Sequence, residues 1–355
     1  MAEEIEAAAA STSIIPESAL TITGVATYKF SYGGWDWFIN QMGDKITTQN
    51  ITNTNYMFAW SQVVAIPFTI NMDENIASYV THDLSYMFNG ATRLVEAPMI
   101  YGVKSASFGS LFSDCQSLTT IPEGFAEDWN WEYVDNLTSA YTGSMASMFY
   151  HCYNLRTIPQ ILLSHGNPYW SYSYPLIKSG FNGCHSLEKI ENVFIPYKGS
   201  YTSSYANAFS DSVKECYRLK KLTLATQEDG TPYTVSWGYQ VIDLTANVGW
   251  STTNYTGLDK RTDFTTDTLI DSEEKWRGYI DGSYPDGWAN DVAYSTFGAT
   301  AAKELFASLP IASGTGNTVK LNANATSAIS GEAMSSLTEE DIAVATAKGW
   351  TITLL

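Results

Sequence analysis

The sequence predicts a β-rich α/β protein, namely a solenoid of short parallel strands and short helical turns with a helix-strand cap at its C-terminal end. Three observations predict this fold. One motif of fixed spacing recurs along the middle of the chain. The composition, with 14% aromatic and 16% charged residues, is that of a folded protein with a polar, uncharged surface. The last residues carry the signals of a capped helix followed by an alternating strand.

Four cysteines mark the recurring motif. They are 37, 32 and 32 residues apart, which is too wide for a CxxC-type metal site. The first three lie in the pattern F-x-x-C-x-x-L-x-x-I-P, although the copy around Cys184 lacks the proline, and the copy around Cys216 keeps only the second half as Cys216-Tyr-Arg-Leu219-Lys-Lys-Leu222. In the copy around Cys216 the nearest phenylalanine is Phe209, seven residues back, so the sequence predicts an insertion there. The equivalent positions are Phe88, Phe112, Phe149 and Phe181, then Cys115, Cys152, Cys184 and Cys216, then Leu118, Leu155, Leu187 and Leu219.

Two further copies lack the cysteine. Ala91 takes its place after Phe88, and Ser61 takes it after Phe58 in a degenerate copy that is one residue short. A single unit cannot bury its own apolar edge, so units must stack, with equivalent side chains about 4.8 Å apart in columns. We expect the cysteines to be packed thiols, because Ala91 and Ser61 fill the same position. The alternatives are disulfides between neighbouring units or a metal site.

These units resemble the BspA-like leucine-rich repeat over residues 55–222. The resemblance implies a curved solenoid with short strands on one face and short helical turns on the other. It also implies a role in binding or adhesion on a cell or particle surface.

Charge and leader signals narrow the functional classes. The chain has 19 basic and 37 acidic residues and a net charge of −18, which argues against nucleic acid as the main partner. Acidic residues stand where a secretory signal would be basic, and no run of 18 apolar residues occurs, so we expect neither an export signal nor membrane insertion. The chain would then be cytoplasmic or would be assembled into a particle released by lysis.

The sequence divides into an N-terminal arm (1–28), a repeat region with its N-terminal cap (29–226) and a C-terminal region (227–355). In the last region, Asp229-Gly230 predicts a hairpin and residues 240–244 predict a strand. Residues 249–291 predict a long insert. Its acidic turn departs from the EF-hand pattern, so we expect a turn-rich loop, no metal ion and no cofactor.

The C-terminal end predicts a helix that Thr338 caps and Gly349 ends, followed by a strand over residues 350–354. Such a helix and strand would cover the apolar end of a solenoid. This ending, together with residues 242–250, is similar to the C-terminal halves of repeat proteins from phages of gut Bacteroidetes, including crAss-like phages. The similarity implies a component of a virion.

Catalytic motifs are absent from the sequence. Neither a zinc-protease, a serine-hydrolase nor a nucleotide-binding pattern occurs. His151 and His185 lie next to repeat cysteines, but a buried structural thiol is inert. Acids such as Asp128, Glu132 and Asp135 could supply a glycosidase pair, although any acidic protein offers such pairs. We therefore expect a non-enzymatic protein.

Aromatic residues in the long inserts are the candidate interaction residues. Flat rings among small polar residues are typical of sugar-binding or protein-binding surfaces. The alternative is that the rings pack back on the solenoid or form contacts between subunits of a homo-oligomer. A separate cluster, residues 35–38, is expected to plug the N-terminal cap. The insert residues are Trp129, Trp131, Tyr133, Tyr169, Trp170, Tyr172 and Tyr174.

These observations predict a structural or host-interaction component of a phage particle: a capsid decoration, a head fibre or a tail protein. Its expected location is the virion. Its partners would be other virion proteins, bound through the arm of residues 1–28, and a host surface glycan or protein. The alternative is a bacterial adhesin or a carbohydrate-binding surface protein.

Overall fold

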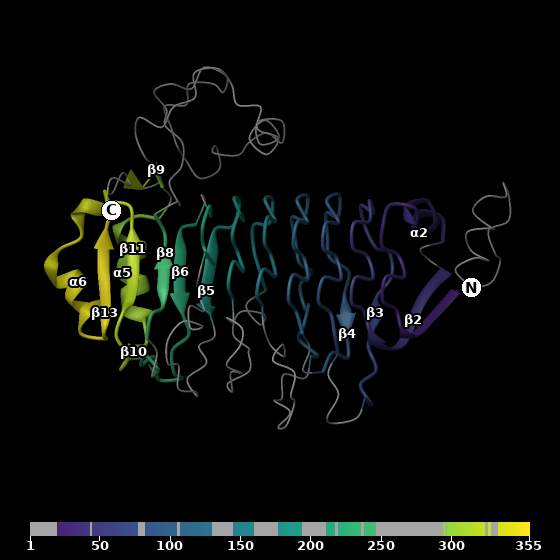
Figure 1. Ribbon diagram of the computed structural model, residues 1–355, viewed down its shortest axis with the longest axis horizontal. Helices are drawn as coiled ribbons and strands as arrows, with labels where there is room; N and C mark the ends of the chain where they lie inside the picture. Colours follow the sequence, from purple (N-terminus) through teal and green to yellow (C-terminus); the bar gives the residue numbers. More distant parts are fainter. Residues whose placement is uncertain are drawn as a thin grey trace, which may run out of the picture.

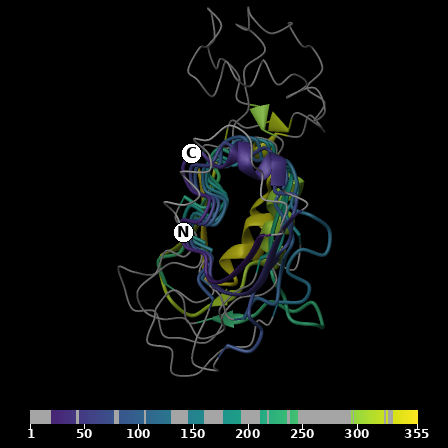
Figure 2. The same ribbon diagram turned by 90° about the vertical axis from the view of Figure 1, so that its right-hand side faces the viewer.

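Successive segments of the protein lie side by side in chain order. In the computed structural model they run along the longest axis, from β1 (Leu20–Val25) to β13 (Trp350–Leu354) (Figure 1). Viewed along that axis, the segments superimpose on one another (Figure 2). The structure describes residues 20–42, 45–76, 82–104, 107–129, 145–159, 177–193, 211–216, 219–235, 238–245, 294–295, 297–323, 326–327 and 333–355.

The secondary structure is mixed, with few helices and with short strands in small sheets. Every pairing between named strands in the described ranges is parallel. Ile70 pairs with Ile100, and Ile190 with Leu222, so equivalent apolar residues face the same interior. The paired strands among residues 20–224 are β1 with β2 (Ile46–Asn53), β3 (Ile70–Asn71) with β4 (Ile100–Tyr101), and β5 (Lys189–Val193) with β6 (Lys221–Leu224).

The C-terminal half contains a three-stranded sheet in the order β13-β11-β8 and two smaller sheets. The expected strand at residues 240–244 is present as β8. The remaining elements are α2 (Asp36–Met42), β7 (Thr234–Val235), β8 (Val241–Asp243), β9 (Tyr294–Ser295), α5 (Ala299–Ser308), β10 (Ile311–Ala312), β11 (Asn317–Leu321), β12 (Thr326–Ser327), the 3-10 helix η2 (Met334–Ser336) and α6 (Glu339–Thr346).

Stacked phenylalanine rings form the centre of the interior. The rings are buried and nearly parallel between neighbouring copies of the motif, which exposes almost none of their apolar surface to water. The leucines of the motif, Leu118, Leu155, Leu187 and Leu219, are also fully buried. The ring centroids are 5.3 Å apart for Phe30 and Phe58, 5.5 Å for Phe58 and Phe88, 5.2 Å for Phe88 and Phe112, 5.6 Å for Phe112 and Phe149, and 6.1 Å for Phe149 and Phe181.

The structure corrects the alignment of the last copy. Val213, three residues before Cys216, takes the position assigned to Phe209 and is buried. The amide of Phe181 donates to Ser212, just as the amide of Phe149 donates to Gly180 in the preceding copy. This copy therefore keeps the three-residue spacing and contains no insertion at this point. It has a valine in place of the phenylalanine. Phe209 itself lies outside the described residues.

The structure also shows two features at the N-terminal end of the repeats. Phe30 adds a copy that the sequence did not reveal, stacked on Phe58. In the copy one residue short, Val63 is fully buried whereas Val64 is 43% exposed, so Val63 takes the leucine position. Trp35 packs edge-on against Phe30, as expected for a plug, whereas Trp37 is exposed.

The expected arm of residues 1–28 is too long. Residues 20–28 belong to the body of the protein, because β1 pairs with β2 and the amide of Tyr28 donates to the carbonyl of Asn55. Residues 1–19 lie outside the described part.

The expected hairpin at Asp229-Gly230 is only a turn. A single antiparallel bridge joins Thr226 and Pro232, and the following strand β7 pairs in parallel with β10. The insert over residues 249–291 lies outside the described residues.

The helix and strand expected at the C-terminal end are present as α6 and β13. The Thr338 hydroxyl accepts a hydrogen bond from the Asp341 amide, and the Asp341 carboxylate accepts one from the Thr338 amide, which forms a capping box. Helix α5 was not expected from the sequence. It is buried through Leu305 and Phe306 and contacts β6, where the Leu224 amide donates to the Ser308 hydroxyl.

Candidate ligand-binding surface

The backbone repeats one feature around each residue of the phenylalanine column. The residues two places before it and two places after it have positive φ, 52–59° and 56–77° respectively, a region that side-chain-bearing residues rarely adopt. We refer to these as the first and second turn positions. The first turn positions are Tyr28, Tyr56, Tyr86, Ser110, Ser147, Ser179 and Asp211, and the second are Tyr32, Trp60, Gly90, Asp114, His151, Gly183 and Glu215.

In the first copies the turn positions carry stacked aromatic rings. The centroid of Tyr56 is 4.8 Å from that of Tyr28 and 4.7 Å from that of Tyr86, with nearly parallel planes. Tyr32 stacks on Trp60 at 5.0 Å. The side chains of Tyr28, Tyr32, Trp60 and Tyr86 are 48%, 61%, 39% and 38% exposed. We refer to Tyr28, Tyr32, Tyr56, Trp60 and Tyr86 together as the aromatic edge.

The aromatic edge exists despite an unfavourable backbone conformation. A side chain at positive φ costs about 1–2 kcal/mol, which glycine would avoid. Ring stacking offsets this cost by about 0.5–1.5 kcal/mol per pair. Partial burial, with smaller effects of Tyr86 and Tyr28, raises the pKa of Tyr56. The Tyr56 hydroxyl group therefore stays protonated at neutral pH.

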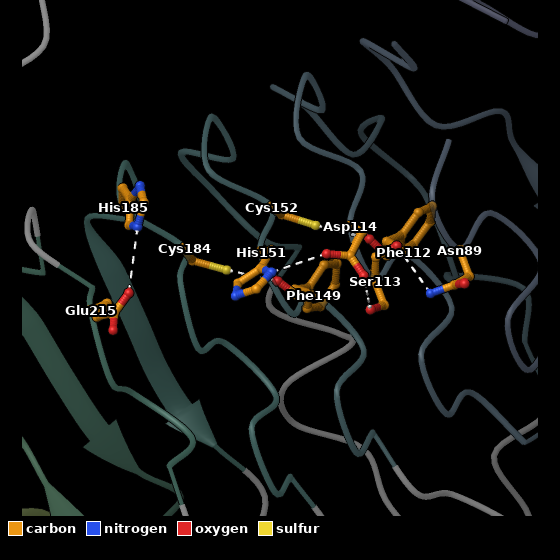
Figure 3. Close-up of polar contacts among 10 residues, drawn as sticks. All are labelled: Asn89, Phe112, Ser113, Asp114, Phe149, His151, Cys152, Cys184, His185 and Glu215. Carbon is orange, nitrogen blue, oxygen red and sulfur yellow. Dashed lines mark hydrogen bonds and ion pairs between the residues drawn. The ribbon is translucent and has the colours of Figure 1, made fainter. Parts of the chain in front are cut away.

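Farther along the chain the second turn positions carry polar side chains at Asp114, His151 and Glu215. His151 Nδ1 is 3.0 Å from Asp114 Oδ1, and the Ser113 hydroxyl donates to Asp114 Oδ2 at 3.2 Å. Figure 3 shows His151 and Asp114 pointing toward each other from neighbouring copies. Both side chains are partly exposed, so their attraction is screened by water.

A second imidazole and carboxylate lie in the next copies. His185 Nε2 is 3.9 Å from Glu215 Oε2 (Figure 3). The His185 ring stacks on Tyr153 with centroids 4.6 Å apart. Burial lowers the pKa of His185, and the neighbouring His185 side chain lowers the pKa of Glu215. Because His185 is almost fully buried, it serves the packing of these copies rather than the surface.

The four cysteines are free, buried thiols. Each thiol donates to the carbonyl of a phenylalanine in the preceding copy, as from Cys152 to Phe112 at 3.1 Å and from Cys184 to Phe149 at 3.0 Å (Figure 3). Burial raises the pKa of all four thiols, among them Cys115 and Cys216. The thiolate that a nucleophile or a metal ligand requires is therefore disfavoured.

Of the seven aromatic candidates from the inserts, the structure describes only Trp129. Its ring is 4% exposed, stacks on Phe108 with centroids 5.3 Å apart, and donates from Nε1 to the Ile100 carbonyl at 2.6 Å. Trp129 thus follows the packing alternative and offers no open face to a ligand. Trp131, Tyr133, Tyr169, Trp170, Tyr172 and Tyr174 lie outside the described residues.

Of the acids considered for a glycosidase pair, the structure describes only Asp128. Asp128 Oδ2 accepts a hydrogen bond from the Gly102 amide at 2.8 Å, and Glu132 and Asp135 lie outside the described part. Within the described ranges no group of three or more histidine, cysteine, aspartate or glutamate side chains could hold a metal ion. None of the described helices has the length and apolarity of a membrane span.

The aromatic edge was not recognised from the sequence. In the sequence it is marked only by a tyrosine two residues before each of Phe30, Phe58 and Phe88. Only the positive φ at these tyrosines turns them toward solvent beside a buried phenylalanine.

Comparison with known proteins found no matching family model, no matching curated protein and no matching solved structure.

Proposed function

We propose that this chain is a BspA-like leucine-rich-repeat solenoid that acts without catalysis, as a structural or host-interaction component of a phage particle. In this role it would be a capsid decoration, a head fibre or a tail protein. The repeats supply a stiff scaffold, and the aromatic edge supplies the surface that meets a partner or the host.

The column of stacked phenylalanines supports the solenoid. Neighbouring copies repeat the same contacts: ring stacking, a hydrogen bond from a thiol to a carbonyl, and hydrogen bonds from the backbone amides of one copy to the carbonyls of the next. Equivalent residues of neighbouring copies pack together in one interior, which is the arrangement expected of stacked repeats.

The exposed aromatic edge is the observation that carries the binding role. Tyrosine and tryptophan side chains combine a large apolar face with a hydrogen-bonding group and are enriched in binding surfaces. In Tyr28, Tyr32, Tyr56, Trp60 and Tyr86 these side chains are aligned on a scaffold whose interior is closed.

The virion as the place of action rests on the resemblance of the C-terminal end to phage repeat proteins. The capped helix α6 and the strand β13 that carry this resemblance close the last sheet. In this proposal, attachment to the particle involves residues 1–19, which precede β1.

Fractionation of an infected culture tests the proposal. Particles released by lysis are purified on a density gradient and probed with an antibody to this chain. We expect the chain to band with the particles and a variant lacking residues 1–19, which keeps β1, to remain in the soluble fraction. Recovery of the chain from uninfected host envelopes would instead favour the bacterial adhesin or carbohydrate-binding surface protein.

A further inference from the structure

We propose that the aromatic edge is a carbohydrate-binding site in which a neutral hexopyranose ring stacks on Tyr86, over Ser110. This inference rests on the proposed function, because it gives a ligand to the same surface.

The tyrosine row ends abruptly at Tyr86. In the part of the chain that the structure describes, Tyr86 has a stacked ring on one side only, that of Tyr56. The Tyr86 amide donates to Gly109 at 2.9 Å, so the copy that contains Ser110 is the direct neighbour on the other side. Ser110 occupies the first turn position there and has no ring.

The spacing of the row defines the space at this end. Tyrosine rings repeat at 4.8 and 4.7 Å along the row, which is also about the spacing of neighbouring strands. A fourth ring would lie over Ser110. A flat ligand ring that contacts the open face of Tyr86 can take that place without moving any other ring.

The chemistry of the site fits a sugar. One face of a pyranose ring is apolar and stacks on an aromatic face, while its hydroxyl groups need hydrogen-bonding partners at the rim. Ser110 offers a hydroxyl group, and the partly exposed Asp114, at the second turn position of the same copy, offers a carboxylate.

The charge of the protein favours a neutral ligand over an anionic one. With a net charge of −18, the chain repels anionic polymers, anionic glycans and a second copy of itself. A neutral glycan meets no such repulsion. The parallel rings of the edge also do not surround a cation, as the cage for a quaternary ammonium group would.

Binding to immobilised glycans tests the inference. The panel holds α-linked and β-linked neutral hexose chains, with sialylated and sulfated glycans for comparison, and calorimetry then measures the affinity of the tightest soluble oligosaccharide. We expect binding to neutral members of the panel. Binding only to anionic glycans, or to none while the protein is folded, would overturn the inference.

Three variants locate the site. Tyr86→Ala removes the stacking face and should weaken binding about tenfold. Ser110→Tyr should fill the open place, abolish binding and leave the protein folded, since tyrosine occupies the equivalent position in the preceding copy. Tyr239→Ala is the matched control, because Tyr239 is 59% exposed and has a φ of 62° but lies outside the aromatic edge.

The three variants can also contradict the inference. Retention of affinity in Ser110→Tyr, or an equal loss in Tyr239→Ala, would place the ligand elsewhere and refute it. Fractionation separates this failure from failure of the proposed function: a chain that bands with particles yet binds no neutral glycan overturns only the ligand.

Discussion

The indole ring of Trp60 lies directly over Gly90 of the next copy. A Cβ added at Gly90 would be 2.6 Å from Trp60 Cδ1, closer than real Cβ contacts allow. Gly90 has a φ of 71°. The absence of a side chain therefore permits both this backbone conformation and the close approach of the Trp60 ring. The same relationship recurs where the His151 ring lies over Gly183.

Gly90→Ala should therefore destabilise the protein through two effects, backbone strain and displacement of Trp60 from its stack on Tyr32. Gly24→Ala is the matched control, because Gly24 has a φ of 70° with nothing within 4 Å of its added Cβ. We expect a cost of about 1–2 kcal/mol for Gly24→Ala and about 1 kcal/mol more for Gly90→Ala. Urea unfolding of both variants measures the difference, and equal costs would show that the ring contact contributes nothing.

Substitution of Tyr56 should reverse the usual order of alanine and glycine. Tyr56→Ala loses the stacking on Tyr28, Trp60 and Tyr86 and keeps the strain of a φ of 56°, whereas Tyr56→Gly loses the stacking but relieves the strain. We expect Tyr56→Gly to be more stable than Tyr56→Ala by about 0.5 kcal/mol or more, after the entropic cost of glycine. Denaturant unfolding of the pair decides, and an alanine variant that is the more stable one would refute the role of backbone strain.

The four cysteine thiols should not react with a thiol reagent in the folded protein. All four are buried and donate to carbonyl groups, and burial raises their pKa. Dithiobisnitrobenzoate at pH about 8 should therefore label none of them within the time that labels free cysteine fully. All four should react in denaturant. Rapid labelling of the native protein would contradict the packed column.

Buried His82 should make the protein less stable in mild acid. Burial lowers the pKa of His82 from 6.5 to about 4, while its Nδ1 accepts the Lys104 amide. Below pH 6.5 the unfolded chain takes up a proton that the folded protein refuses until about pH 4. Stability is thus complete above that window and falls within it as the pH drops, by roughly 2–3 kcal/mol.

His82→Asn isolates this effect, because asparagine is neutral at every pH and keeps an acceptor for the Lys104 amide. Unfolding free energies of the two proteins are compared between about pH 7 and pH 4. The variant should show the shallower decline. Parallel curves would mean that another group, such as His185 with its own lowered pKa, causes the acid sensitivity.

The periodic part of the fold could be predicted because its spacing is strict. Cys115, Cys152 and Cys184 mark the copies, and all three side chains are fully buried. Phe30 escaped detection because its copy has Gly33 at the cysteine position and continues into helix α2. Val213 escaped because a nearby phenylalanine fitted the motif better than a valine.

The aromatic edge could not be predicted by the same reasoning. A tyrosine next to a buried phenylalanine in sequence is equally compatible with packing inside and with exposure. Its direction depends on positive φ at residues such as Tyr56 and Tyr86, and hydrogen bonds between copies impose that backbone. Trp129, by contrast, lies between Asp128 and Asn130, polar residues that are typical of a surface, yet its indole packs in the interior.

A double-mutant cycle tests the shared interior most directly. Phe112 and Phe149 stack at 5.6 Å, whereas Phe88 and Phe181 are both buried but are separated by these two residues. Substitution by leucine, singly and in pairs, gives the coupling energy from denaturant unfolding. We predict a coupling of about 0.5–1.5 kcal/mol for Phe112 with Phe149, and additivity within about 0.5 kcal/mol for Phe88 with Phe181. Additive effects of Phe112 and Phe149 would contradict the stacked column.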